Sequence, residues 1–251
     1  MKTLKSTLVL VILLMFTPML SNAQDMYRVH EDIVKPSHVM EYEGILAEMM
    51  AMVNKHQITD ASWLCSVTSN SHYLYVSSIK NYADIDKPSF ITQLIEKEGR
   101  DKIADLFNRM DKCYDTELDY IISLNKDLTY MPEGISQTQE GQNYRNYHIL
   151  YVSPENRTIV KEKLKELKAL NEAKKSKVYY RVYNSGFGTD GEYVMVAISA
   201  KDALDMEQTG KENDAIVGKE SQDIINQMNF NCLRYEKLEA NIRPDLGYTS
   251  K

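Results

Sequence analysis

An internal repeat constrains the fold of this chain more than any other feature of its sequence. When the sequence is compared with itself at an offset of 118 residues, without a gap, identical residues coincide from about residue 26 to the end. The coinciding pairs include His30 and His148, Pro36 and Pro154, Leu46 and Leu164, Tyr75 and Tyr193, and Met110 and Met228. One offset held along the whole chain predicts two copies of one supersecondary unit.

The repeat also predicts how the chain is divided. We expect the first copy to span residues 26–133 and the second to span residues 144–251. The polar stretch between them, residues 134–143, is rich in glutamine and glycine and has the composition of a linker.

The first 23 residues have the pattern of a secretory signal peptide. Lys2 and Lys5 precede an apolar stretch from Leu8 to Phe16, and a short segment of small residues ends at Ala23. A membrane anchor is the alternative, but it needs about 20 apolar residues without an interruption such as Pro18. We expect cleavage after Ala23, a periplasmic or secreted protein, and no membrane span in the mature chain.

The composition of the chain limits the classes of function that the protein can have. The chain is 43% hydrophobic and 26% charged, which is enough for a sizeable core. Without the signal peptide, 28 basic residues face 36 acidic ones, and the net charge is about −8 with histidine counted as neutral. This balance argues against nucleic acid as a partner, because phosphates require a basic surface.

Cysteine and histidine are scarce. The sequence has three cysteines and five histidines, so it offers neither a disulfide framework nor the spacing of a metal site, and we expect no metal and no cofactor. An odd cysteine count leaves at least one thiol unpaired within the chain. We expect all three cysteines, Cys65, Cys113 and Cys232, to behave as small buried hydrophobic residues.

Hydrophobic periodicity predicts the same order of elements in each copy. In the first copy the predicted elements are a strand at 26–34, a helix at 39–56, hairpin strands at 62–68 and 72–79, a helical region at 87–114 and a strand at 116–123. In the second copy they are a strand at 144–152, a helix at 156–175, hairpin strands at 177–185 and 192–199, a helix at 211–231 and a strand at 233–241. Strand, helix, strand, strand, helix, strand is the ferredoxin-like order, with two helices on one face of an antiparallel sheet.

A short tail follows the last strand of each copy. Asp127-Leu-Thr-Tyr130 and Asp245-Leu-Gly-Tyr248 share the pattern Asp-Leu-x-Tyr. With this tail, the ferredoxin-like order and the tandem duplication, the chain resembles an exported bacterial member of the dimeric α/β-barrel superfamily. The resemblance implies an α+β fold in which two antiparallel sheets pack face to face as a barrel within one chain. The superfamily includes cofactor-independent monooxygenases, haem-degrading enzymes, dye peroxidases and many members without a known activity.

The alternation of residues along the strands predicts which side chains face the barrel interior. We assign the more apolar face of each strand to the helices. This places Tyr27, Val29 and Ile33 against the helices and sends the opposite face into the space between the sheets. The predicted interior residues, which are our candidate ligand-binding residues, are His30, His148, Tyr75 and Tyr193, with Arg28 and Tyr73 beside them.

Imidazole and phenol groups have the chemistry of a polar, aromatic pocket. The alternative is that these groups hydrogen-bond one another in a closed core. A further motif, Gly186-Phe-Gly-Thr-Asp-Gly191, matches the pattern of a dinucleotide-binding loop. It lacks the helix that must follow such a loop, and we interpret it as a hairpin.

Three functions fit these observations. The first is an exported binding or accessory protein that holds a small aromatic or amphipathic molecule between the two sheets. The second is an enzyme, either a cofactor-independent monooxygenase or a haem-dependent enzyme, with His30 or His148 as base or iron ligand. The third is a structural module that dimerises through its sheets. The chain is expected to be either a monomer with an internal pseudo-dimer or a homo-oligomer.

Overall fold

The structure, a computed structural model, describes residues 25–250. The predicted signal peptide, residues 1–23, lies outside the described residues. No helix between residues 25 and 250 combines the length and the apolar character needed to cross a membrane.

Two sets of elements follow one another in the predicted order, which confirms the fold class. The first set is β1 (Met26–Val34), α2 (Val39–His56), β2 (Ser62–Thr68), β3 (His72–Ile79), α3 (Phe90–Glu98), α4 (Arg100–Met110) and β4 (Tyr114–Leu124). The second set is β5 (Tyr144–Val152), α5 (Arg157–Lys174), β6 (Tyr180–Ser185), β7 (Glu192–Ala200), α6 (Ala203–Val217), α7 (Lys219–Asn231) and β8 (Arg234–Ile242). Short 3-10 helices at Pro36–His38 and Tyr82–Asp86 complete the first set.

Each helical region predicted after the hairpin consists of two helices. The chain breaks at Gly99 and Gly218, which have φ angles of 92° and 74°. Glycine accepts this left-handed region because it has no Cβ. Asp202 caps α6 by accepting a hydrogen bond from the backbone N–H of Asp205, so this helix begins well before the predicted start at residue 211.

Eight strands form one closed antiparallel barrel. Hydrogen-bonded neighbours follow the order β3-β1-β4-β6-β7-β5-β8-β2, and β2 pairs with β3 to close the ring. Within each set, the order of the four strands is that of a ferredoxin-like unit. Between the sets, β4 pairs with β6 and β2 pairs with β8. The two sheets therefore face each other across the barrel and are joined along both edges.

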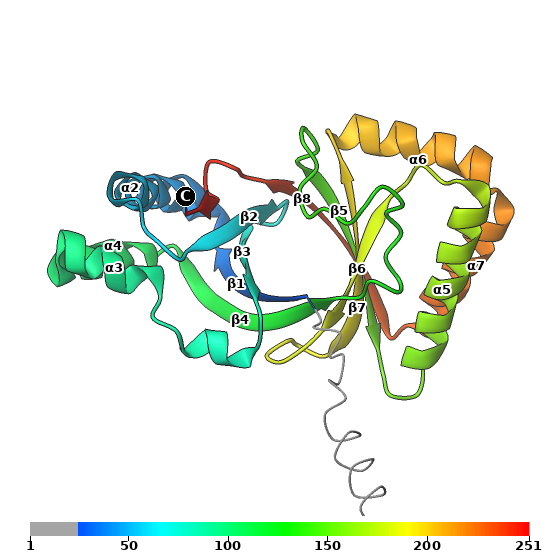
Figure 1. The fold of residues 1–251 in the computed structure, drawn as a ribbon, viewed down its shortest axis with the longest axis horizontal. Coiled ribbons are helices and arrows are strands. Elements are labelled where there is room, and N and C mark those ends of the chain that lie inside the picture. Colours follow the sequence, from blue (N-terminus) through cyan, green and yellow to red (C-terminus); the bar gives the residue numbers. More distant parts are fainter. Residues whose placement is uncertain (1–24, 251) are drawn as a thin grey trace, which may run out of the picture.

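The helices cover the barrel on two opposite sides. Figure 1 shows α2, α3 and α4 on one side and α5, α6 and α7 on the other. Three apolar clusters follow from this arrangement: one between each helical layer and the barrel wall, and a third inside the barrel. Cys65 and Cys113 are buried free thiols in the first cluster, as expected, whereas the free thiol of Cys232 is only partly buried, against expectation.

The 118-residue offset holds in β1, β4, β5 and β8 but not in the hairpin strands β2, β3, β6 and β7. His30 of β1 pairs with Asp119 and Tyr75, whereas the equivalent His148 pairs with Lys237 and Val196. The pairing of β4 and β8 thus keeps the 118-residue offset, but β7 is shifted by three residues relative to β3. The ungapped equivalence of Tyr75 and Tyr193 is therefore wrong, and an odd shift places the two side chains on opposite faces.

Each Asp-Leu-x-Tyr tail packs on the other set of elements. Tyr130 forms a bridge with Tyr180 of β6, and β9 (Tyr248–Thr249) pairs with β2 through Tyr248 and Trp63. The indole N–H of Trp63 donates to the carbonyl oxygen of Leu246 at 2.9 Å. The tails therefore join the two sets, in addition to the two strand pairs that close the barrel.

Candidate functional site

A cavity of about 520 Å³ lies inside the barrel. Every second residue of the strands contributes to its lining, for example Tyr27, Val29 and Glu31 of β1 and Tyr193 and Met195 of β7. Most of the lining is apolar or aromatic. It includes six tyrosines: Tyr27, Tyr120, Tyr147, Tyr151, Tyr183 and Tyr193.

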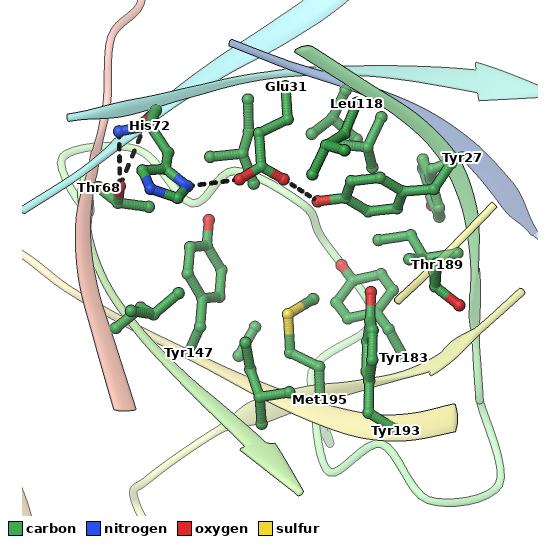
Figure 2. Close-up of a pocket in the computed structure, with 18 of the residues that line it drawn as sticks. Tyr27, Glu31, Thr68, His72, Leu118, Tyr147, Tyr183, Thr189, Tyr193 and Met195 are labelled. Carbon is green, nitrogen blue, oxygen red and sulfur yellow. Dashed lines mark hydrogen bonds and ion pairs between the residues drawn. The ribbon is translucent and has the colours of Figure 1, made fainter. Parts of the chain in front are cut away.

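The carboxylate of Glu31 lies within this largely apolar lining. Glu31 of β1 is 9% exposed, and one of its oxygens lies 2.6 Å from Nδ1 of His72 in β3. The other oxygen accepts a hydrogen bond of 2.8 Å from the Tyr120 hydroxyl of β4. Figure 2 shows Glu31 and His72 side by side at the cavity wall. Each carboxylate oxygen keeps a second lone pair, so Glu31 can still accept a proton or a hydrogen bond from a bound molecule.

Tyr193 points into the same cavity from β7 (Figure 2). Its hydroxyl makes no hydrogen bond to any of residues 25–250, although its backbone N–H donates to Ser185 at 2.9 Å. Burial raises the pKa of the Tyr193 phenol, which keeps the hydroxyl protonated and able to donate.

The two ends of the cavity differ. At one end the linker crosses the barrel, and the Gln137 side chain donates to the Tyr27 hydroxyl at 2.9 Å and accepts from the Tyr183 hydroxyl. At the other end the lining includes Leu118, which is 39% exposed, and hairpin residues such as Asn70 and Asp190. A small molecule therefore has access from the hairpin end, while the linker end is closed.

The predicted orientation of β1 is wrong. Tyr27, Val29 and Ile33 line the cavity, whereas Arg28 and His30 lie on the outer face. The barrel interior is itself an apolar core, so the more apolar face of this strand turns inward and not toward the helices.

His30 and Arg28 belong to an outer polar cluster. The His30 ring lies 3.2 Å from Asp32 and 3.3 Å from Asp119, and Arg28 pairs with Asp119 at 2.7 Å. The hydrogen bond to Asp32 is the main cause that raises the pKa of His30 to about 9, and the negative charge of Asp119 adds to it. The ligand atoms of His30, Asp32 and Glu117 lie within 4.8 Å of one another on this outer face.

Tyr75 and Tyr73 also point away from the cavity, so their predicted orientation is wrong. The Tyr75 hydroxyl lies 2.9 Å from the Tyr42 hydroxyl of α2, and the Tyr73 hydroxyl donates to Glu43 of α2 at 2.7 Å. Both phenols therefore link the sheet to the first helix.

In the second set, His148 points outward and Tyr193 inward. The predicted orientation of His148 is thus wrong, and that of Tyr193 is confirmed. Nδ1 of His148 lies 2.7 Å from the Tyr235 hydroxyl, and burial, together with the charge of Lys237, lowers the pKa of His148 to about 4. Of the six candidate residues, only Tyr193 reaches the cavity.

Sequence reasoning missed Glu31 and His72. Glu31 is the one charged residue in the apolar face of β1, which is the signal that could have identified it. Because the apolar face of β1 was assigned to the helices, Glu31 was not identified as a residue of the barrel interior.

The cavity lining does not fit a haem that is ligated by histidine. Among the histidines of residues 25–250, His72 alone lines the cavity. Its Nδ1 faces Glu31 at 2.6 Å and its Nε2 lies 3.1 Å from the Asn70 amide nitrogen. An axial iron ligand needs a free ring nitrogen, and both ring nitrogens of His72 already face a partner.

No protein-family model matches the sequence, and no curated protein matches it either. Solved structures with a similar fold do exist. An anthrone oxidase-like protein aligns with a TM-score of 0.58 and 9% identity, over 89% of this chain and 92% of that chain.

Two further structures, each provisionally described as a monooxygenase, are similar. The protein from Lactobacillus acidophilus has a TM-score of 0.52 and 8% identity over 90% of this chain and 97% of that chain. The protein from Fusobacterium nucleatum has a TM-score of 0.50 and 13% identity over 88% of this chain and 93% of that chain. At such low identity the likeness concerns the fold alone. The chain has the dimeric α/β-barrel fold, formed within a single polypeptide.

Proposed function

We propose that this protein binds one small aromatic or amphipathic molecule inside its barrel. The observation that carries the proposal is the cavity of about 520 Å³, a size typical of small-molecule sites, with six tyrosines in its lining. Tyrosine rings offer flat apolar surfaces to a ligand, and their hydroxyls offer hydrogen bonds. Glu31 and the free hydroxyl of Tyr193 are two polar groups of the lining that would help to fix its orientation.

A cavity-filling substitution tests this proposal. Met195 lines the cavity, and Met195→Trp would fill part of it with an indole ring. The matched control is Met40→Trp on α2, where the side chain is 91% exposed. With the neutral fluorophore N-phenyl-1-naphthylamine, we expect Met195→Trp to weaken binding at least about tenfold and Met40→Trp to leave it unchanged. Equal binding by all three proteins would contradict a site in the barrel.

A cofactor-independent oxygenase is the second candidate function, and the Glu31 carboxylate favours it. A base held by His72 and Tyr120 in an apolar site could take a proton from an electron-rich aromatic substrate, and dissolved dioxygen would then oxidise the resulting anion. The similar fold of an anthrone oxidase-like protein makes anthrone a suitable test substrate. Oxygen consumption that Glu31→Gln abolishes, while fluorophore binding persists, would support catalysis.

We also propose that the protein acts after export and that its units are residues 26–133 and 144–251, joined by residues 134–143. The basic start, apolar stretch and small-residue exit of residues 1–23 support cleavage after Ala23. Amino-terminal sequencing of the exported protein should therefore begin at Gln24. An intact Met1 in a membrane fraction would contradict it.

A further inference from the structure

Two arginines lie next to each other at the closed end of the cavity. Arg145 of β5 and Arg181 of β6 both line it, and they are 2% and 3% exposed. Both guanidinium groups donate to the same carbonyl oxygen, that of Gln137, at 3.2 Å and 3.4 Å. The barrel thus holds two neighbouring positive charges away from bulk water.

Neither arginine has a carboxylate partner among residues 25–250. Their acceptors are backbone carbonyl oxygens and the Ser199 hydroxyl. Three carboxylates line the cavity. Glu31 bonds to His72 and Tyr120, Glu236 bonds to Tyr151 and Arg234, and Asp190 lies on the exposed hairpin at the opposite end.

Other arginines of this protein show the usual arrangement. Arg109 pairs with Glu48 at 2.6 Å and Arg243 pairs with Glu43 at 2.7 Å, although both arginines are far more exposed. Buried charges are normally paired with an opposite charge, because their transfer from water costs several kcal/mol. Burial, and then the charge of Arg181, lowers the pKa of Arg145 to about 10, which still leaves it positively charged near neutral pH.

Both guanidinium groups keep unused donors. A guanidinium has five N–H groups. Arg145 uses three hydrogen bonds, to Gln142, Tyr144 and Gln137, and Arg181 uses three, to Ser136, Gln137 and Ser199. The guanidinium groups of Arg145 and Arg181 therefore present positive charge without a carboxylate partner, and N–H groups without an acceptor, at this end of the cavity.

We propose that Arg145 and Arg181 form an anion subsite and that the molecule bound in the barrel is an aromatic carboxylate. This inference rests on the proposed binding function. The carboxylate lies at the closed end, where the planar guanidinium groups can each bind it through two N–H groups. The apolar body of the ligand extends along the tyrosines and Met195 toward the hairpin end.

A matched pair of probes tests the charge requirement in the unmodified protein. 2-Naphthoate and 2-naphthamide have nearly the same shape, but only the first is an anion. Isothermal titration calorimetry at pH 7 should give a dissociation constant at least about tenfold lower for 2-naphthoate. Equal affinities would overturn the anion subsite while leaving the proposed binding function intact. Binding of neither probe, nor of N-phenyl-1-naphthylamine, would overturn both.

Substitutions at Arg145 and Arg181 test whether these two residues cause the preference for 2-naphthoate over 2-naphthamide. Arg145→Gln and Arg181→Gln should each reduce the preference for 2-naphthoate to about threefold or less, with little change for 2-naphthamide. Arg145→Lys and Arg181→Lys keep the charge, should retain part of the preference, and replace the glutamine variants if those fail to fold. Arg109→Gln on α4 removes one positive charge outside the barrel and should change neither affinity. A full preference in all arginine variants would overturn the assignment.

Discussion

At the scale of single residues, His30 and His148 show how one position of the repeat acquires two electrostatic environments. They occupy equivalent sites in β1 and β5 and face equivalent residues of β4 and β8. The residue opposite His30 is Asp119, whereas the residue opposite His148 is Lys237. The pKa of His30 is therefore raised to about 9, mainly through Asp32, and that of His148 is lowered to about 4, mainly by burial.

These shifts predict opposite pH dependences of stability. Protonated His30 stabilises the fold below pH 6.5, and this contribution is lost as the pH rises through about 9. Because the His30 ring is partly exposed, we expect about 1 kcal/mol after allowing for solvent screening. Neutral His148 acts the other way: the unfolded chain takes up a proton below pH 6.5, so stability is lost as the pH falls toward about 4.

Urea unfolding between pH 4 and pH 10 checks both effects. His30→Asn should remove the loss of unfolding free energy between pH 6.5 and 9, and His148→Asn should remove the loss between pH 6.5 and 4. Each variant serves as the control for the other. If His30→Asn has the same alkaline profile as the wild type, the ion pairs with Asp32 and Asp119 do not stabilise the fold.

At the scale of elements, the sequence predicts the strands well and their orientation poorly. The bounds of β1, β2, β3 and β5 agree with the expected ranges, because short β-rich segments stand between clear turn residues. The orientation of β1, β3 and β5 is reversed, since both faces of a barrel strand are buried and apolarity does not tell them apart. In β7 the run Val194, Val196 and Ile198 identified the helix-facing side correctly.

The hairpin between β6 and β7, where the 118-residue offset is not kept, packs closely on β4. It extends beyond the strands and lies on β4, where the N–H of Ile121 donates to the carbonyl oxygen of Phe187 at 2.8 Å. Gly188 has a φ angle of 85°, and a Cβ there would lie 2.5 Å from the carbonyl oxygen of Asp119. The glycine motif that resembles a dinucleotide loop thus allows close approach of two backbones.

Gly188→Ala should destabilise the protein by more than the cost of placing alanine in a left-handed backbone conformation, because the added Cβ also meets the carbonyl oxygen of Asp119. Gly141 is a matched control, because its φ angle is 73° and a Cβ there would contact nothing within 4 Å. We expect about 1–2 kcal/mol for Gly141→Ala and about 1–3 kcal/mol more for Gly188→Ala. Thermal unfolding of the two variants measures the difference, and equal losses would show that the hairpin moves away from β4 without cost.

At the scale of the whole molecule, the two sets of elements depend on each other. β4 pairs with β6, β2 pairs with β8, and each tail packs on the opposite set. Tyr193 and Val29 belong to different sets but share the apolar cluster inside the barrel. Separating the sets would therefore expose two strand edges and one apolar sheet face on each.

This dependence predicts that neither half is a stable monomer. Residues 25–143 and 144–250, produced separately, should aggregate or pair with a second copy of themselves, because a second ferredoxin-like sheet is needed to cover the exposed face. Mixed together, they should form a one-to-one complex, which size-exclusion chromatography with light scattering would detect. The halves should also bind N-phenyl-1-naphthylamine only as that complex, since the cavity lining comes from both. A monomeric half that unfolds cooperatively would show that the barrel seams are not needed for folding.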